Sequence, residues 1–359
     1  MVLLDDRTSA SHPTHERVIS VSDKAAGLEA IIAIHSTARG PAFGGCRVKP
    51  YPSRADALRD ALRLSEAMSR KSAMAGLPFG GGKCVVIADP ATQKTDAMLR
   101  ALAEAIHQLG GSYLTADDSG TSVRDMEVMR EITPHARGFA LHTGEACPAA
   151  AYGTFLALRA AVEHRWGLSG LGGVRVAVQG LGNLGMRLCA YLSEAGAELV
   201  VADPRRELVE RAALDFGAEA VSVDRILSEP VDVLSPNAFE DVICDASLPL
   251  IRAGIVVGGA NNQLQTAQHG LALHQRRILY VPDYIANAGG VIDVAMEGAG
   301  YSTQGVLKAC EAIAETTTDL LEEARRRSVA PSQLADELAA QRMGRTRAMD
   351  GVMAEAVAA

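Results

Sequence analysis

The chain contains few aromatic residues and no long apolar segment. Phe, Trp and Tyr make up 4% of its 359 residues, and no uninterrupted apolar run reaches the length that crosses a membrane. Residues 1–7 lack a basic stretch followed by an apolar segment, so a secretory signal peptide is not expected. These absences favour a cytoplasmic protein.

Basic clusters, paired cysteines and metal-ligand spacings are also absent from the sequence. The net charge is -8 and no basic face is clustered, which argues against general nucleic-acid binding. The six cysteines are scattered and never form a CxxC motif, so reduced thiols are expected rather than a disulfide framework. The nine histidines show no ligand spacing with cysteines or carboxylates, and we predict no metal site. The GxSxG signature of serine nucleophiles is missing too.

Length and composition instead favour a two-domain α/β enzyme. A chain of 359 residues exceeds the usual size of a single core. The expected division places one domain in residues 1–145 and a second in residues 146–325. Residues 326–359 are expected to form helices that pack back onto the first domain.

The first half of the chain contains alternating strand and helix patterns. Residues 18–21 and 28–34 predict a β-hairpin. Ser53 and Asp56 resemble a capping box, which opens a helix that ends near Lys71. The glycine run at 80–82 predicts a turn, followed by a strand at 84–87, a helix at 96–109 and a short strand at 113–115.

Two lysines, Lys71 and Lys83, flank a stretch that carries no charge from Ser72 to Gly82. Burial and a neighbouring cation would lower the pKa of Lys83 and allow its amine to act as a base. The segment is not a phosphate-binding P-loop, because Leu77 stands where that motif needs glycine and Cys84 where it needs Ser or Thr.

An acidic pair, Asp117 and Asp118, follows the short strand at 113–115 and precedes Ser-Gly-Thr. Loops at strand ends often carry functional groups. Solvated loop carboxylates are the more common role of such a pair. Spacing alone leaves both interpretations open.

The second half of the chain contains a dinucleotide-binding pattern. A β-rich run at 174–179 leads into Gly180, Gly182 and Gly185, then a helix and a strand at 198–202 that ends at Asp203. Glycines allow close approach of a pyrophosphate, and the helix N-terminus supplies oriented N–H groups. Asp203 favours NAD, because a carboxylate binds the ribose hydroxyls and repels a 2′-phosphate. Arg205 and Arg206 could instead accommodate that phosphate, so NADP stays an alternative.

Taken together, six segments resemble the Glu/Leu/Phe/Val amino-acid dehydrogenase family, nearest to its leucine, valine and phenylalanine branch. The resemblance extends from about His15 to Met343. The segments that carry it are residues 40–45, 71–83, 115–121, 180–185, 258–263 and 282–290.

The resemblance implies an N-terminal αβ substrate and oligomerisation domain, a C-terminal Rossmann domain, a cleft between them and a homo-oligomer. The implied reaction is reversible, NAD-dependent oxidative deamination of an L-amino acid to the 2-oxo acid and ammonia. Lys71 would hold the substrate carboxylate and Lys83 would be the base that activates water against the imine. Asp118 would relay protons and bind the amino group.

Further residues take roles from the same resemblance. Gly44 and Gly45 would let the backbone approach the substrate carboxylate, and Asn261 or Asn262 would contact substrate and nicotinamide. The implied cofactor-binding residues are Gly180, Gly182, Asn183, Leu184, Gly185, Asp203, Pro204, Arg205, Asn262 and Asn287.

Substrate choice is less sharply indicated. Ala116, Val291 and Val294 fall on positions that line the family's side-chain pocket and suggest an aliphatic substrate such as Leu, Val or Ile. Phe43 stands where leucine enzymes have a smaller residue, so it would shorten the pocket towards valine or stack on an aromatic side chain. An aromatic substrate, Phe or Trp, is therefore the alternative.

Some positions depart from the family pattern. Ala150 or its neighbour stands where the family usually has Thr or Ser, and the loop at 138–147 lacks the glycine-rich family pattern. Asn237 and Phe239 replace the usual Cys and Leu. They motivate another hypothesis, a dinucleotide-binding sensor of the same fold with impaired turnover.

Overall fold

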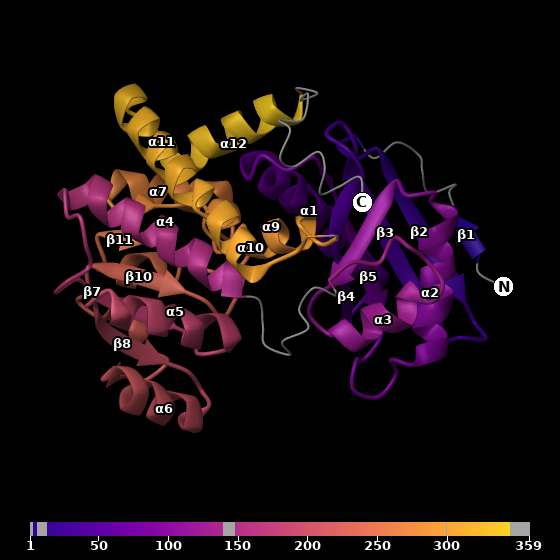
Figure 1. The fold of residues 1–359 in the computed structure, drawn as a ribbon, viewed down its shortest axis with the longest axis horizontal. Helices are drawn as coiled ribbons and strands as arrows, with labels where there is room; N and C mark the ends of the chain where they lie inside the picture. Colours follow the sequence, from indigo (N-terminus) through magenta and orange to yellow (C-terminus); the bar gives the residue numbers. More distant parts are fainter. Residues whose placement is uncertain (1–2, 6–12, 139–147, 299, 345–359) are drawn as a thin grey trace. The chain divides into compact units, whose positions relative to one another are not determined.

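A computed structural model describes residues 3–5, 13–138, 148–298 and 300–344. The chain divides into two compact units. The first comprises Met1–His142, Val294–Gly300 and Ala339–Ala359, and the second comprises Thr143–Asp293 and Tyr301–Leu338. Each unit is built on its own six-stranded sheet (Figure 1). In the described part of the chain, no helix combines the length and apolar character needed to cross a membrane.

The sheet of the first unit has the strand order β1-β2-β3-β5-β4-β6. Strands β2 and β3 pair antiparallel, so the predicted hairpin is confirmed, whereas β5, β4 and β6 run parallel to one another. The strands are β1 (Leu3–Asp5), β2 (Arg17–Asp23), β3 (Leu28–Ser36), β4 (Ala42–Lys49), β5 (Gly80–Ile87) and β6 (Tyr113–Asp117).

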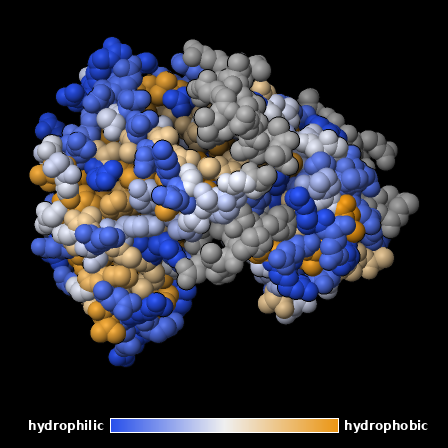
Figure 2. Space-filling model, in the orientation of Figure 1, coloured by the Kyte–Doolittle hydropathy of each residue, from blue (hydrophilic) through white to orange (hydrophobic). Residues whose placement is uncertain are grey.

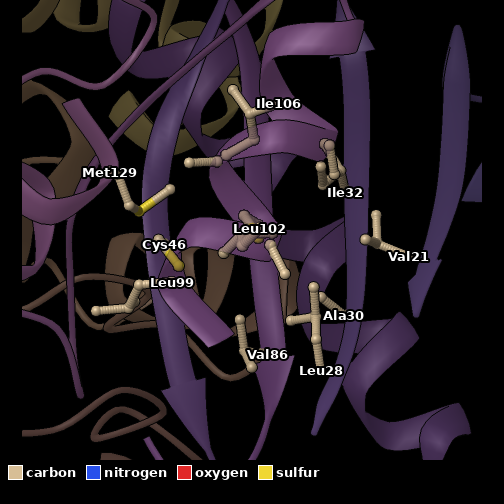
Figure 3. Packing of buried hydrophobic residues seen from close by; sticks show 14 of the residues in the cluster. Val21, Leu28, Ala30, Ile32, Cys46, Val86, Leu99, Leu102, Ile106 and Met129 are labelled. Carbon is tan, nitrogen blue, oxygen red and sulfur yellow. The ribbon is translucent and has the colours of Figure 1, made fainter. Parts of the chain in front are cut away.

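Two helices cover the opposite faces of this sheet. Helix α1 (Arg54–Met74) begins at Ser53, whose side chain accepts a hydrogen bond from the backbone N–H of Asp56, and Lys71 lies in its last turn. Helix α2 (Asp96–Gln108) packs on the other face, where Leu99, Leu102 and Ile106 lie against strand side chains (Figure 3). A short helix, α3 (Val123–Arg130), follows β6 and begins with a capping box. The helix and strand pattern expected for this half of the chain is confirmed.

The glycine run is the exception, because Gly80, Gly81 and Gly82 are the first residues of β5 and not a turn. A β-carbon on Gly81 would lie 2.2 Å from the backbone nitrogen of Ser69 in α1, and one on Gly82 would lie 2.7 Å from the ring of Tyr113. Glycine is therefore needed for close packing on both faces of the strand. The predicted turn was wrong.

The second unit contains a fully parallel sheet of order β12-β11-β10-β7-β8-β9. This is the strand order of a Rossmann fold. Its first and fourth strands, here β7 and β10, are neighbours, and successive strands are added outward on either side of them. The predicted α/β class with a Rossmann domain is confirmed. The strands are β7 (Arg175–Gln179), β8 (Glu198–Ala202), β9 (Glu219–Ala220), β10 (Val233–Pro236), β11 (Ile255–Val256) and β12 (Leu279–Tyr280).

Helices surround this parallel sheet, and a buried cluster that includes Val200, Leu234 and Leu273 forms part of its core. Helix α4 (Pro148–Trp166) packs extensively against α11 (Ala312–Arg327) and α5 (Asn183–Glu194). The other helices of the unit are α6 (Arg206–Phe216), α7 (Ala267–Gln275), α8 (Asp283–Ala286) and α10 (Thr303–Cys310). Two helices span the division between the units, α9 (Gly289–Ala295) and α12 (Pro331–Met343).

Candidate functional site

A short polar contact in the first unit joins two of the residues singled out from the sequence. The Nζ atom of Lys83, on β5, donates a hydrogen bond of 2.5 Å to Oδ2 of Asp118, which directly follows β6. The side chain of Lys83 is only 6% exposed and that of Asp118 is 20% exposed. A parallel strand, β4, lies between the two strands in the sheet. The pair is thus a buried ion pair held across three strands.

Glycines on β4 make room for this ion pair. A β-carbon on Gly45 would lie 2.8 Å from the β-carbon of Asp118, and one on Gly44 would lie 1.7 Å from the carbonyl oxygen of Gly82. Ala116 pairs with Gly45 in the sheet register. Glycine at 45 therefore leaves room for Asp118, and glycine at 44 lets β4 lie close to the backbone of β5.

The loop after β6 fixes the position of Asp118. Thr121 accepts a hydrogen bond from the backbone N–H of Asp118 at 2.8 Å, and its hydroxyl donates to the carbonyl of Cys46 on β4. Gly120 adopts a φ of +83° and lies against Val48, where a β-carbon would meet the carbonyl oxygen at 2.1 Å. The acidic loop is therefore anchored to β4, the strand that carries Gly44 and Gly45.

Lys71 lies on α1, the helix that packs against β5. The close approach of α1 to β5 at Gly81 and Ser69 places the last turn of α1, with the half-buried Lys71, over the first residues of β5. Lys83 lies two residues after Gly81 on the same face of that strand. Lys83 thus faces α1, and Lys71 lies at the C-terminal end of that helix.

Sequence reasoning missed an arginine that completes the cluster. Arg47, 9% exposed, donates from Nε to the same Oδ2 atom of Asp118 at 3.1 Å and from Nη1 to Oδ2 of Asp60 at 3.1 Å. Tyr51 donates to that oxygen of Asp60 at 2.5 Å. Strand alternation could have flagged Arg47, because it lies two residues after Gly45 and so faces the same side of the sheet.

The pKa values of the two carboxyls in the acidic pair, Asp117 and Asp118, are shifted in opposite directions. Burial by itself would raise the pKa of Asp118, but the charges of Lys83 and Arg47 outweigh it and lower that pKa below its ordinary value. The pKa of Asp117 is raised by burial, with smaller contributions from the charges of Asp118 and Glu297. Asp118 is therefore held as a carboxylate, which fits a site role better than a solvated loop.

The side chains expected to line the substrate pocket are mostly buried. Phe43, on β4, is 3% exposed and its ring lies 5.3 Å from that of Phe79, centroid to centroid. Ala116 and Val291 are 4% and 5% exposed, and Val294 is half-buried on α9.

The dinucleotide loop has the backbone geometry that its glycines suggest. Gly180 follows β7 with a φ of +91°, and Gly182 is the N-cap of α5. A β-carbon on Gly185 would lie 1.9 Å from the carbonyl oxygen of Gly180, so glycine is required where α5 meets the turn. Asn183 and Leu184 form the first turn of α5. Their free N–H groups face the loop in the manner of an anion-binding helix start.

Asp203 is fully engaged by its neighbours at the end of β8. Its Oδ2 atom accepts from the backbone N–H of Leu181 at 2.7 Å, and Arg205 binds both carboxylate oxygens at 2.9 and 3.0 Å. The hydrogen bonds from Arg205, ahead of those from the backbone, lower the pKa of Asp203 to about 2. Pro204 is exposed between them. A hollow of about 450 Å³ beside the glycine turn is lined in part by Gly182 and Arg205.

An amide cluster of the second unit offers unsatisfied polar atoms. Asn287 donates from Nδ2 to Oδ1 of Asn261 at 2.8 Å and to the carbonyl of Gly259 at 3.1 Å. Its Oδ1 atom and the Nδ2 atom of Asn262 are buried without a hydrogen-bond partner. One orphan acceptor and one orphan donor match the two halves of a carboxamide such as that of nicotinamide. The residues present therefore fit a nicotinamide dinucleotide.

The departures from the family pattern have partial structural explanations. Asn237 accepts from the backbone N–H of Gly259 at 2.8 Å and donates to Ser235, which ties the end of β10 to the loop at 258–262. Phe239 is 62% exposed. Ala150 lies in the first turn of α4. Residues 139–147 of the altered loop lie outside the described residues.

Known protein families match both halves of the chain. Residues 15–135 match the dimerisation domain of Glu/Leu/Phe/Val dehydrogenases, and residues 202–351 match the Glutamate/Leucine/Phenylalanine/Valine dehydrogenase family. Leucine dehydrogenase of Bacillus cereus is 42% identical over 92% of this chain and 91% of its own length. Valine dehydrogenase of Streptomyces virginiae is 40% identical over 93% and 95%.

Solved structures agree with the sequence relatives. The crystal structure of L-tryptophan dehydrogenase from Nostoc punctiforme aligns with a TM-score of 0.80 and 38% identity over 94% of this chain and 98% of that chain. The resemblance inferred from the motifs is confirmed. The chain belongs to the Glu/Leu/Phe/Val dehydrogenase family, and it is an amino-acid dehydrogenase whose cofactor is a nicotinamide dinucleotide.

Proposed function

We propose that the protein catalyses the reversible, NAD-dependent oxidative deamination of a branched aliphatic L-amino acid to its 2-oxo acid and ammonia. The observation that carries this proposal is the contact between Lys83 and Asp118 beside Gly45 of β4. In a member of this family, that arrangement supplies a base and a carboxylate at one place. The bound nicotinamide would accept hydride from the α-carbon of the substrate.

The two lysines take different roles in this proposal. Lys71, in the last turn of α1, holds the substrate carboxylate by charge and hydrogen bonding. Lys83 is the base that removes a proton from the water that attacks the substrate iminium. Gly44 and Gly45 leave the backbone of β4 open to the substrate carboxylate.

Asp118 is better suited to binding positive charge than to storing a proton. Its pKa is lowered by Lys83 and Arg47, so the carboxylate gives up a proton readily and stays ionised. It therefore binds the substrate amino group as an anion and stabilises the iminium that replaces it. Proton relay through Asp118 is limited to brief transfer along the 2.5 Å contact with Lys83.

NAD is the proposed cofactor. Asp203 lies at the end of β8, where a carboxylate can bind ribose hydroxyls and repels a 2′-phosphate. Arg205 binds both oxygens of Asp203, so the ribose hydroxyls would have to replace this arginine at the carboxylate. Gly180, Gly182 and Gly185 would hold the pyrophosphate, with Asn262 and Asn287 at the nicotinamide carboxamide.

Branched aliphatic substrates are favoured over aromatic ones. The leucine and valine dehydrogenase relatives, together with the aliphatic Ala116, Val291 and Val294, support this choice. The tryptophan dehydrogenase relative and the contact between the rings of Phe43 and Phe79 make an aromatic amino acid the second candidate. The family's dimerisation domain supports a homo-oligomer, and we place the enzyme in the cytoplasm.

A substrate panel tests the function. NADH formation is followed at alkaline pH with aliphatic and aromatic L-amino acids, and the reverse reaction is followed with 2-oxo acids and ammonia, with NAD and NADP compared. Lys83→Ala should lower kcat by roughly 10²- to 10⁴-fold and leave NAD binding intact. The exposed Lys24→Ala serves as the matched control. If no amino acid of the panel yields NADH while NAD still binds, the sensor hypothesis is favoured. A near-normal kcat in Lys83→Ala would refute the assignment of Lys83 as the base.

A further inference from the structure

A second hollow of the Rossmann unit shares no residue with the dinucleotide loop or the amide cluster. Its volume is about 730 Å³, within the range of small-molecule sites. It lies where the C-terminal ends of α4, α7 and α11 come together, the first and last of which Figure 1 shows at the same end of the unit. The lining residues come from these helix ends, from β12 and from the start of α12.

The rim of this hollow is cationic. Arg165, Arg277 and Arg325 line it together with His164 and His274, whereas no Asp or Glu is among the described lining residues. None of the three arginines has a carboxylate partner in the part of the chain that the structure describes. The Nη2 atom of Arg165 donates to the carbonyl of Arg277 at 3.1 Å, which keeps these two residues together.

Helix dipoles explain only part of the cluster. His164, Arg165 and Arg325 lie in the last turns of α4 and α11, where cations stabilise the helix ends. Arg277 lies beyond the end of α7 with a φ of +61°, a conformation that costs a non-glycine residue about 1 kcal/mol. Ser328, on the same wall, has a φ of +56°. Both residues end helices in the usual left-handed conformation, because the following amides of Ile278 and Val329 donate back to the carbonyls of Leu273 and Ala324.

The floor of the hollow is apolar. Leu321, Ala324 and Pro331 are buried, as is Ile278 at 7% exposure, whereas the surface over α11 is largely hydrophilic (Figure 2). Planar guanidinium groups bind phosphate oxygens in pairs. An apolar floor below them suits a ring or an alkyl group.

We propose that this hollow is an effector site for an organic phosphate. Arg165, Arg277 and Arg325 bind the phosphate groups, and the organic part lies on Ile278 and Leu321. The site is separate from the catalytic residues, so a ligand here would change the stability of the Rossmann unit without occupying the substrate or dinucleotide positions.

Titration calorimetry with uridine triphosphate as the probe tests this site. Saturating NADH is included so that the dinucleotide site is filled, and the readout is binding, which does not depend on turnover. The double variant Arg165→Gln/Arg325→Gln should lose at least roughly tenfold in affinity, because two charge-assisted contacts are removed. Arg252→Gln is the matched control, since Arg252 is an exposed arginine of the same unit outside the hollow. Arg325→Gln alone repeats the test without disturbing the contact between Arg165 and Arg277.

Inorganic triphosphate and uridine are titrated separately to measure how much each half of the nucleotide contributes to its affinity. Weaker binding of each fragment than of the nucleotide supports the proposal. Equal affinity for inorganic triphosphate would show a surface for any polyanion and would overturn it. Absence of nucleotide binding at millimolar concentration, or equal affinity in the double variant and in Arg252→Gln, would overturn it as well.

Discussion

Arg47 is predicted to be a positioning residue for the proposed catalytic pair, Lys83 and Asp118, and Arg47→Met is the variant that tests it. Arg47 and Lys83 donate to one oxygen of Asp118, and Arg47 also binds Asp60. The four side chains together carry two positive and two negative charges. Removal of Arg47 leaves a net negative cluster and deprives two carboxylates of a donor, and the Asp118 carboxylate then keeps Lys83 as its charged partner.

The expected loss of unfolding free energy follows from the partial burial of these side chains. The side chains of Arg47, Asp118 and Asp60 are 11%, 20% and 16% exposed, so loss of the arginine should cost about 2–3 kcal/mol of unfolding free energy. Displacement of Asp118 by even about 1 Å should lower kcat by up to roughly a hundredfold. Arg47→Lys keeps the charge but cannot bridge both carboxylates, so it should recover only part of the activity.

The pH dependence separates positioning from simple loss of stability. Charges from Lys83 and Arg47 lower the pKa of Asp118, so the stability that its ionised form contributes is present above its ordinary pKa and is lost as pH falls through the lowered value. Without Arg47 that pKa rises. The acid limb of kcat, which reports groups that must lose a proton before they act, should therefore move to higher pH, while the alkaline limb stays in place.

Steady-state deamination across pH, together with thermal unfolding, measures these effects. The matched control is Arg54→Met, because Arg54 pairs with Glu29 at the surface of the same unit, where both side chains are about half exposed. An exposed pair of this kind contributes at most about 1 kcal/mol. If Arg47→Met keeps kcat within twofold and an unchanged acid limb, the positioning role is refuted.

Other substitutions probe the packing, the cofactor and the substrate. Gly81→Ala should destabilise the protein by about 1–3 kcal/mol, because the new β-carbon would lie 2.2 Å from the nitrogen of Ser69; thermal unfolding should show no such loss for Gly170→Ala, which points into open space. Asp203→Ala should raise the Kd for NAD more than that for NADP, and a larger effect on NADP would assign cofactor choice to the neighbouring arginines. Phe43→Leu should increase kcat/KM for leucine relative to valine if the ring shortens the pocket, and an unchanged ratio would place that limit elsewhere.

Local patterns were sufficient to predict most of the fold. The cap at Ser53, the hairpin and the strand–glycine–helix sequence at 175–194 depend on neighbouring residues, and the structure contains each of them. The glycine run at 80–82 was mistaken for a turn because glycine is common where the chain bends. Its actual cause is the space taken by α1 on one face and Tyr113 on the other, which no local pattern contains.

The candidate site was only partly accessible to the same reasoning. Lys83 and Asp118 stood out through their motifs, but 35 positions separate them in the chain, and their contact depends on the strand order β5-β4-β6. Arg47 and Asp60 gave no motif signal, since an ion-pair network between a strand and a helix exists only after both have packed. Strand alternation identifies which residues share a face, whereas the register decides which of them touch.

At this site the charged side chains meet because glycines let their backbones approach closely. Gly44 and Gly45 bring β4 close to Lys83 and Asp118, and Gly81 brings the helix that carries Lys71 down onto β5. Shifts of a few tenths of an ångström in that packing would lengthen the 2.5 Å contact between Lys83 and Asp118. Catalysis in this enzyme should therefore be as sensitive to an added methyl group at these glycines as to the loss of a charge.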